Sequence, residues 1–233
     1  MRLVIRKDKK ITAEEMDQLR REFTKLYKKN AGVTPEFYIE EHDYTNYPTY
    51  VDSDGDKRPT ERFLKDISSG VYDRYGEFGT DHIVVLVHED NWRSPSIWGV
   101  AYSNLWHTYQ VTYCRFDKDN SANSLGTLHH EVMHTLDMLV KTTIGVNLDK
   151  IDIFAPDWDQ QVVHGKGANY SYIRHKDNLD ALQYISPYLQ EAYAKRRSMH
   201  EKHIGKMKQL VQLLQQLIVL LRAVYNKKNG VPK

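Results

Sequence analysis

Apolar and polar residues follow one another along the first 140 positions in short blocks whose spacing switches between that of strands and that of helices. Short apolar runs predict strands, and apolar residues three and four apart predict helices. The expected strands are residues 3–5, 37–41, 83–87, 97–106 and 109–116. The expected helices are residues 12–30, 60–75 and 125–140. This order predicts an α+β fold in which helices pack on a mixed five-stranded sheet.

Local signals support several of these boundaries. Thr12 and Glu15 have the spacing of a capping box, and Gly32 is placed to end the same helix. The run 83–87 is continuously apolar, which is typical of a strand covered on both faces. Only His107 and Thr108 separate the last two strands, so these are expected to form a hairpin. Polar loops are expected at residues 42–59 and 117–124.

The C-terminal part differs from the rest, because residues 187–225 read as one long helix with two apolar seams. Each seam repeats with alternating steps of three and four residues, as in a heptad pattern. The first seam is Met207, Val211, Leu214, Ile218, Leu221 and Tyr225. The second is Leu210, Leu213, Leu217, Leu220 and Val224. So wide a face predicts packing between two neighbours, either as a core helix of this chain or in a homo-oligomer.

Charge is divided unevenly along the chain. All 233 residues together carry a formal net charge of +2, which argues against a dedicated nucleic-acid binder. Residues 187–233, however, hold ten Lys and Arg against two Glu, a net +8, so the preceding 186 residues carry −6. The basic residues precede the most apolar stretch instead of alternating through it, so binding to a membrane surface is not expected.

The single cysteine and the N-terminus narrow the class of protein further. Cys114 alone cannot form an internal disulfide or a Cys-rich zinc finger. No segment has the pattern of a signal peptide, and no apolar run reaches the length of a membrane span. A cytoplasmic protein is therefore expected.

The strongest chemical signal is His130-Glu131-Val132-Met133-His134, an HExxH motif on a predicted helix. Histidines at i and i+4 lie on one face, so both imidazoles can bind the same Zn²⁺. Glu131 projects beside that position, where it can act as general base toward a metal-activated water. The competing interpretation is a helix with two surface histidines and a glutamate. Uncharged residues on either side of the motif favour the metal site.

This motif and the order of elements before it resemble the zincin metallopeptidases. The resemblance implies a catalytic domain over residues 1–186, with a sheet subdomain at 1–140 and a C-terminal subdomain from 141, followed by the basic helix 187–233. It also implies that residues 97–104 form an edge strand along which a peptide substrate lies. Gly99 would then let the substrate backbone approach, or it is simply tolerated in a hairpin.

The third zinc ligand is left open between two residues. A metzincin would carry Gly at position 137 and His or Asp at 140; Asp137 and Val140 stand there instead, so this is not a metzincin. His164 lies in an apolar, Gly-containing segment that suits a ligand loop and is the preferred candidate. Asp180, with Tyr172 before it, resembles the gluzincin arrangement, although it also suits the start of a helix. Asp137 is either an acceptor for a ligand imidazole or a solvated carboxylate.

Together these features predict a zinc-dependent endopeptidase, a hydrolase in which His130, His134 and His164 hold Zn²⁺ and Glu131 is the general base. The zincin resemblance implies that a tyrosine, either Tyr170 or Tyr172, stabilises the developing oxyanion, and Tyr172 is the preferred candidate. The expected partner of the protein is a peptide or protein substrate. The alternative is a non-catalytic zincin-like scaffold that oligomerises through its C-terminal helix.

Overall fold

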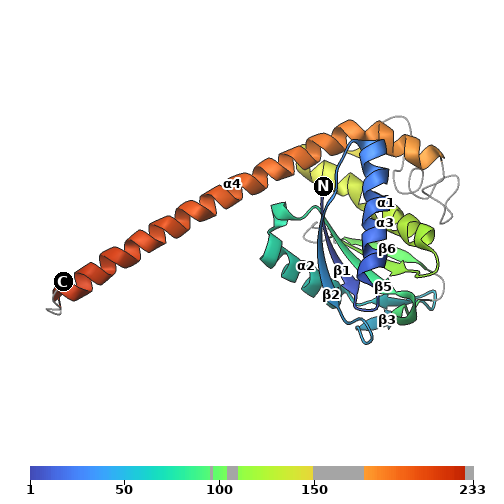
Figure 1. The fold of residues 1–233 in the computed structure, drawn as a ribbon, viewed down its shortest axis with the longest axis horizontal. Helices are drawn as coiled ribbons and strands as arrows, with labels where there is room; N and C mark the ends of the chain where they lie inside the picture. The colour runs from blue at the N-terminus through green and yellow to red at the C-terminus, as the bar shows by residue number, and fades with distance from the viewer. Residues whose placement is uncertain (95–96, 104–109, 149–175, 229–233) are drawn as a thin grey trace. The chain divides into compact units, whose positions relative to one another are not determined.

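The computed structural model describes residues 1–94, 97–103, 110–148 and 176–228 and contains a mixed five-stranded sheet (Figure 1). The strand order is β2-β1-β5-β7-β6. Neighbouring strands are parallel except for β6, which runs antiparallel to β7 at one edge. The strands are β1 (Arg2–Asp8), β2 (Glu36–His42), β5 (His82–His88), β6 (Gly99–Ser103) and β7 (Gln110–Phe116). The predicted α+β class and mixed sheet are confirmed.

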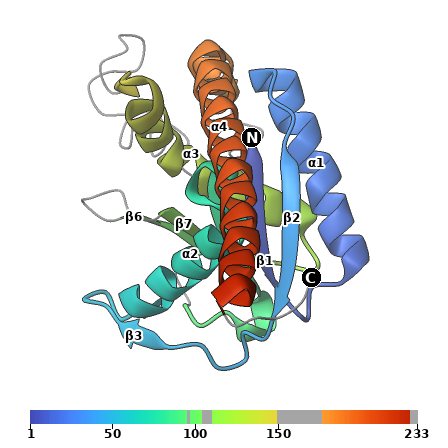
Figure 2. The same cartoon turned by 90° about the vertical axis from the view of Figure 1, so that its left-hand side faces the viewer.

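Helices cover both faces of this sheet, which explains why its central strand β5 is apolar from residue 83 to residue 87. Every residue of β5 is buried. One face packs against α1 (Ala13–Ala31), α3 (Ser121–Ile144) and the first part of α4 (Lys176–Lys228). The other packs against α2 (Glu61–Tyr75) together with Tyr44 and Tyr47. Figure 2 shows α1 and α2 on opposite sides of the sheet. Short 3₁₀ helices, Glu77–Gly79 and Glu89–Asn91, precede and follow β5.

The predicted ends of α1 are confirmed by its hydrogen bonds. The Glu15 backbone N–H donates to Thr12 Oγ1 at 3.2 Å, and the Thr12 backbone N–H donates to the Glu15 carboxylate at 2.8 Å. This reciprocal capping box satisfies two backbone donors that the first turn leaves without helical partners. At the other end Gly32 adopts φ 63°, a left-handed conformation that favours glycine, and ends the helix.

The expected polar loop at residues 42–59 is wrong in part, because it contains a small hairpin. Its strands are β3 (Thr49–Val51) and β4 (Lys57–Pro59), and they pair antiparallel. The Asp52 carboxylate accepts hydrogen bonds from the backbone N–H groups of Asp54 and Asp56, both at 2.9 Å, and so organises the turn. Strands of three residues are too short to show an alternating pattern, so the hairpin had no periodic signal.

The helix that carries the HExxH motif is longer at both ends than expected. It begins at Ser121, because the Asn120 side chain caps it by accepting a hydrogen bond from the Asn123 backbone N–H at 3.1 Å. It continues to Ile144 and ends at Gly145, whose φ is 79°. The second half of the expected loop 117–124 is therefore helical.

The last helix, α4, begins at Lys176, so the expected start at Pro187 is wrong. Leu182, Ile185 and Leu189 are buried in the main core, and this burial outweighs the backbone hydrogen bond that Pro187 cannot donate. The structure divides into two units, Met1–Arg196 and Arg197–Lys233. Within the described ranges, we find no helix with the length and apolar character that a membrane crossing requires.

Candidate metal centre

The HExxH residues are held by the apolar face of α3. Leu128, Val132 and Leu136 follow one another at intervals of four, and each is fully buried in the core beneath the sheet. This burial fixes the rotation of the helix about its axis. His130 and His134 are then half-buried on another side, while Glu131 is buried at 4% exposure. The motif is thus anchored by core packing but keeps two imidazoles accessible.

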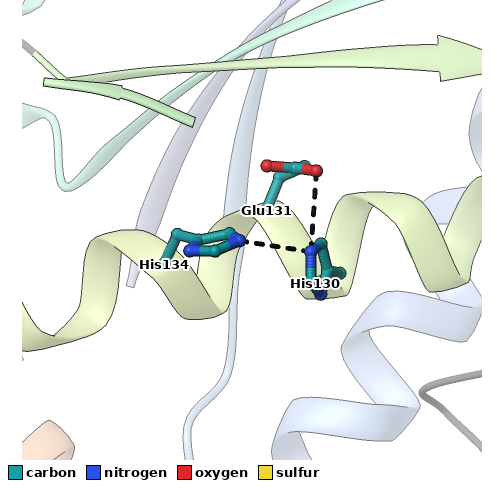
Figure 3. A group of neighbouring side chains, drawn as sticks. All are labelled: His130, Glu131 and His134. Atoms are coloured by element: carbon teal, nitrogen blue, oxygen red, sulfur yellow. Dashed lines mark hydrogen bonds and ion pairs between the residues drawn. The ribbon is translucent and has the colours of Figure 1, made fainter. Parts of the chain in front are cut away.

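The three side chains converge closely (Figure 3). The Nε2 atoms of His130 and His134 are 3.1 Å apart, and their rings are nearly perpendicular, at 86°. Glu131 Oε1 lies 3.9 Å from His130 Nε2. Ligand atoms of all three residues fall within 4.8 Å of one another. Among the described residues, this is the one group of three or more His, Cys, Asp or Glu side chains with a spacing that could hold a metal ion.

The edge strand β6 lies directly against Glu131. A Cβ atom placed on Gly99 would be 2.6 Å from both Cγ and Oε1 of Glu131 and 2.9 Å from its Cδ. These separations are far below an ordinary van der Waals contact, so Glu131 occupies the space that a side chain at position 99 would need. The sequence left Gly99 open between room for a substrate backbone and a glycine tolerated in a hairpin, and neither interpretation included this contact with Glu131. The isolated glycine in a strand was the available signal.

The negative charge of Glu131 affects the thiol of Cys114 on the neighbouring strand β7. Cys114, on β7, pairs with Gly99 across the β6–β7 ladder and is completely buried. Burial, and then the charge of Glu131, raise the pKa of the Cys114 thiol well above its ordinary value. The thiol is therefore protonated at neutral pH and is unsuited to bind a metal as a thiolate.

Two neighbours of the motif have clear structural roles. His129 is fully buried, and its Nδ1 lies 3.2 Å from the Tyr27 hydroxyl on α1. Burial lowers the pKa of His129 to about 4, so this imidazole is neutral and joins α3 to α1. Asp137 Oδ1 accepts a hydrogen bond from the Leu148 backbone N–H at 2.9 Å. It thereby ties the chain that follows α3 back to the helix.

The remaining predicted site residues are not brought into this group by the described structure. His164, Tyr170 and Tyr172 lie outside the described residues. Asp180 belongs to α4, but its side chain is also outside them. The choice between His164 and Asp180 as third ligand therefore stays a prediction.

The two imidazoles fit a zinc ion. Bonds of about 2.0–2.1 Å in a tetrahedral site place two ligand nitrogens about 3.3–3.4 Å apart. The Nε2 atoms of His130 and His134 are already 3.1 Å apart, so only a small change in side-chain torsion separates them from that distance. Neutral imidazole nitrogens suit Zn²⁺, and a carboxylate adjacent to them is available either as a ligand or as a base.

Comparisons with known proteins add no assignment. No protein-family model, curated protein or solved structure matches the chain.

Proposed function

We propose that this chain is a zinc-dependent peptidase with a zincin-like fold, in which His130 and His134 hold the metal. The observation that carries the proposal is the 3.1 Å separation of their Nε2 atoms beside the buried Glu131 carboxylate. His164 or Asp180 would supply the third protein ligand. Zinc, when bound, would polarise a carbonyl oxygen and acidify a water molecule.

Glu131 would act as the general base. Its carboxylate sits beside the two imidazoles and not between them, so it can take a proton from a water molecule there. The same carboxyl group can then give that proton to the leaving amine. Because Gly99 of β6 lies against the Glu131 side chain, the carboxylate is held in one place and little reorganisation is needed for the reaction.

The edge position of β6 supports a peptide as the substrate. Among the described strands, β6 pairs with β7 alone, so its other side offers backbone N–H and C=O groups. An extended peptide can add to such an edge as a further strand. Since Gly99 of this strand touches Glu131, a peptide bound along it would pass close to the proposed base.

Zinc analysis and a peptidase assay test the proposal together. We expect about one zinc per chain, lost in His130→Ala and His134→Ala and kept in the control His203→Ala, which changes an exposed histidine of the C-terminal unit. His164→Ala and Asp180→Ala, measured side by side, identify the third ligand by the loss of zinc affinity. Glu131→Gln should retain zinc but lose hydrolysis of a quenched-fluorescence peptide library.

Each alternative predicts a different result. Full hydrolysis by Glu131→Gln would contradict Glu131 as the base. Zinc binding without hydrolysis by the unaltered chain would favour the non-catalytic scaffold. A chain that binds no zinc would contradict the metal centre itself.

A further inference from the structure

The C-terminal unit carries an unusually large apolar surface. Within residues 204–224, Ile204 and the side chains of the two seams expose between 40% and 64% of their area. The exposed apolar side chains are Ile204, Met207, Leu210, Val211, Leu213, Leu214, Leu217, Ile218, Leu220, Leu221 and Val224. So many exposed apolar side chains are normally covered by a partner, because a contiguous apolar patch of such size is rare on a monomeric protein.

The first seam has the residue pattern of a coiled coil. Extended by one step of three residues back to Ile204, this seam gives heptad positions a and d in turn to Ile204, Met207, Val211, Leu214, Ile218 and Leu221. The a positions are therefore β-branched (Ile, Val, Ile) and the d positions are unbranched at Cβ (Met, Leu, Leu). This is the choice of side chains that parallel coiled-coil helices use to interlock.

The second seam requires another neighbour. Each of its members comes one residue before a member of the first seam, so the two seams lie about 100° apart around the helix axis. A two-stranded coiled coil would bury one seam and leave the other in water. In a closed ring each helix can instead turn one seam toward each neighbour, and about 100° lies between the corner angles of four- and five-membered rings.

We propose that residues 204–224 assemble with the same segment of at least two further copies of this chain into a closed ring of parallel helices. Cyclic symmetry makes the contact heterologous, with the first seam of one helix against the second seam of the next. The polar side chains on the remaining sector, Gln209, Gln212 and Gln216, stay in solvent.

The charges of the segment favour a second copy over an anionic membrane. Residues 209–221 contain no charged side chain, and Lys206, Lys208 and Arg222 flank them. A helix that lies on a membrane surface carries its basic residues along the polar face, whereas glutamines occupy that face here. Repulsion between the flanking basic residues of neighbouring copies is screened by salt, so salt strengthens self-association but weakens binding to anionic lipid.

Three consecutive positions provide a matched test in the full chain. Leu217 (50% exposed) belongs to the second seam and Ile218 (48%) to the first, while Val219 is more exposed, at 65%, and lies outside both. Mass measurement by light scattering after size exclusion should give three or more chains per particle, with four or five best matching the seam angle. Leu217→Gln and Ile218→Gln should each raise the midpoint concentration of dissociation at least tenfold, and Val219→Gln should leave it within twofold. Far-UV circular dichroism verifies that the variants remain helical.

Several outcomes would overturn the assembly. The proposal would be contradicted by a monomer or dimer at 100 µM protein in 0.5 M NaCl. It would also be contradicted if all three substitutions changed the midpoint concentration of dissociation equally. Co-sedimentation with phosphatidylserine-containing vesicles by a chain that stays monomeric would assign the surface to lipid instead.

Discussion

Gly99 of strand β6 and Glu131 of helix α3 are in such close contact that only a hydrogen at position 99 leaves room for the carboxylate. A Cβ there would lie 2.6 Å from Glu131 Cγ. The proposed general base is thus positioned by the absence of a side chain on the strand opposite it.

Gly99→Ala should lower peptidase activity without removing zinc. The added methyl must displace Glu131 by about 1 Å, and misplacement of a catalytic group by that distance can cost about 10²-fold in rate. We expect kcat/KM to fall at least tenfold while the zinc content remains unchanged. Gly70→Ala is the control, because a Cβ at Gly70 on α2 would meet only the far end of the Arg74 side chain, at 3.7 Å. Unaltered kcat/KM in Gly99→Ala would show that the base does not depend on this contact.

Zinc should stabilise the folded chain through His130 and His134. A ligand at about 100 times its dissociation constant adds about 2.7 kcal/mol to the free energy of unfolding. For a unit of this size, that corresponds to an increase in Tm of roughly 5–10 °C. Differential scanning fluorimetry with and without zinc checks the shift. Glu131→Gln should retain it, His134→Ala should lose it, and an equal shift in His134→Ala would place the metal elsewhere.

The pairing of the two histidines was easier to predict from the sequence than the contacts around them. Histidines four apart on a helix share a face whatever the rest of the fold does, so His130 and His134 could be paired from spacing alone. The contact of Glu131 with Gly99 joins a strand to a helix residue 32 positions later in the chain, and no local pattern encodes that. Most strands were predictable because their apolar runs are long, as in β5.

The predicted helix boundaries were wrong where tertiary contacts or side-chain caps outweigh the periodicity of apolar residues. Pro187 suggested the first turn of a helix, yet α4 passes through it. The Ser186 hydroxyl and the Gln190 amide each donate a hydrogen bond to the Ala31 carbonyl oxygen at 3.0 Å, holding this part of α4 against the end of α1. Such contacts join residues more than 150 positions apart and are invisible to any sequence window.

Stability should fall with acidification through the buried His82. Its Nδ1 lies 3.0 Å from Thr135 Oγ1, and its Nε2 lies 2.9 Å from the Tyr193 hydroxyl. The Thr135 hydroxyl donates to the Val132 carbonyl oxygen, so we assign the His82 ring proton to Nδ1 and the accepting role to Nε2. Burial lowers the pKa of His82 to about 4, from an ordinary value of 6.5. In the unfolded chain, therefore, His82 takes up a proton at a higher pH than in the folded chain.

The contribution of neutral His82 to the free energy of unfolding is consequently complete above about pH 6.5. It is lost, at up to about 1.4 kcal/mol per pH unit, as the pH falls toward 4. Urea denaturation between pH 8 and pH 4 measures it. His82→Asn should be less stable at pH 8 but lose stability more gradually on acidification. His203→Gln is the control and should keep the slope of the unaltered chain. Equal slopes in His82→Asn and the unaltered chain would mean that His82 does not titrate in this range.

Asn120→Ala should destabilise the helix that carries the candidate site. The Asn120 side chain accepts a hydrogen bond from the Asn123 backbone N–H, and removal of such a cap costs about 1 kcal/mol. Asn120→Asp should remain close to the unaltered chain, since Asp is an equally good cap, and Asp119→Ala serves as the neighbouring control. Urea denaturation gives the difference in free energy, and equal stability of Asn120→Ala and Asp119→Ala would refute the cap. The core-facing leucines of α3, not this first turn, set the rotation of His130 and His134, so zinc stoichiometry should be unchanged in Asn120→Ala even though its stability falls.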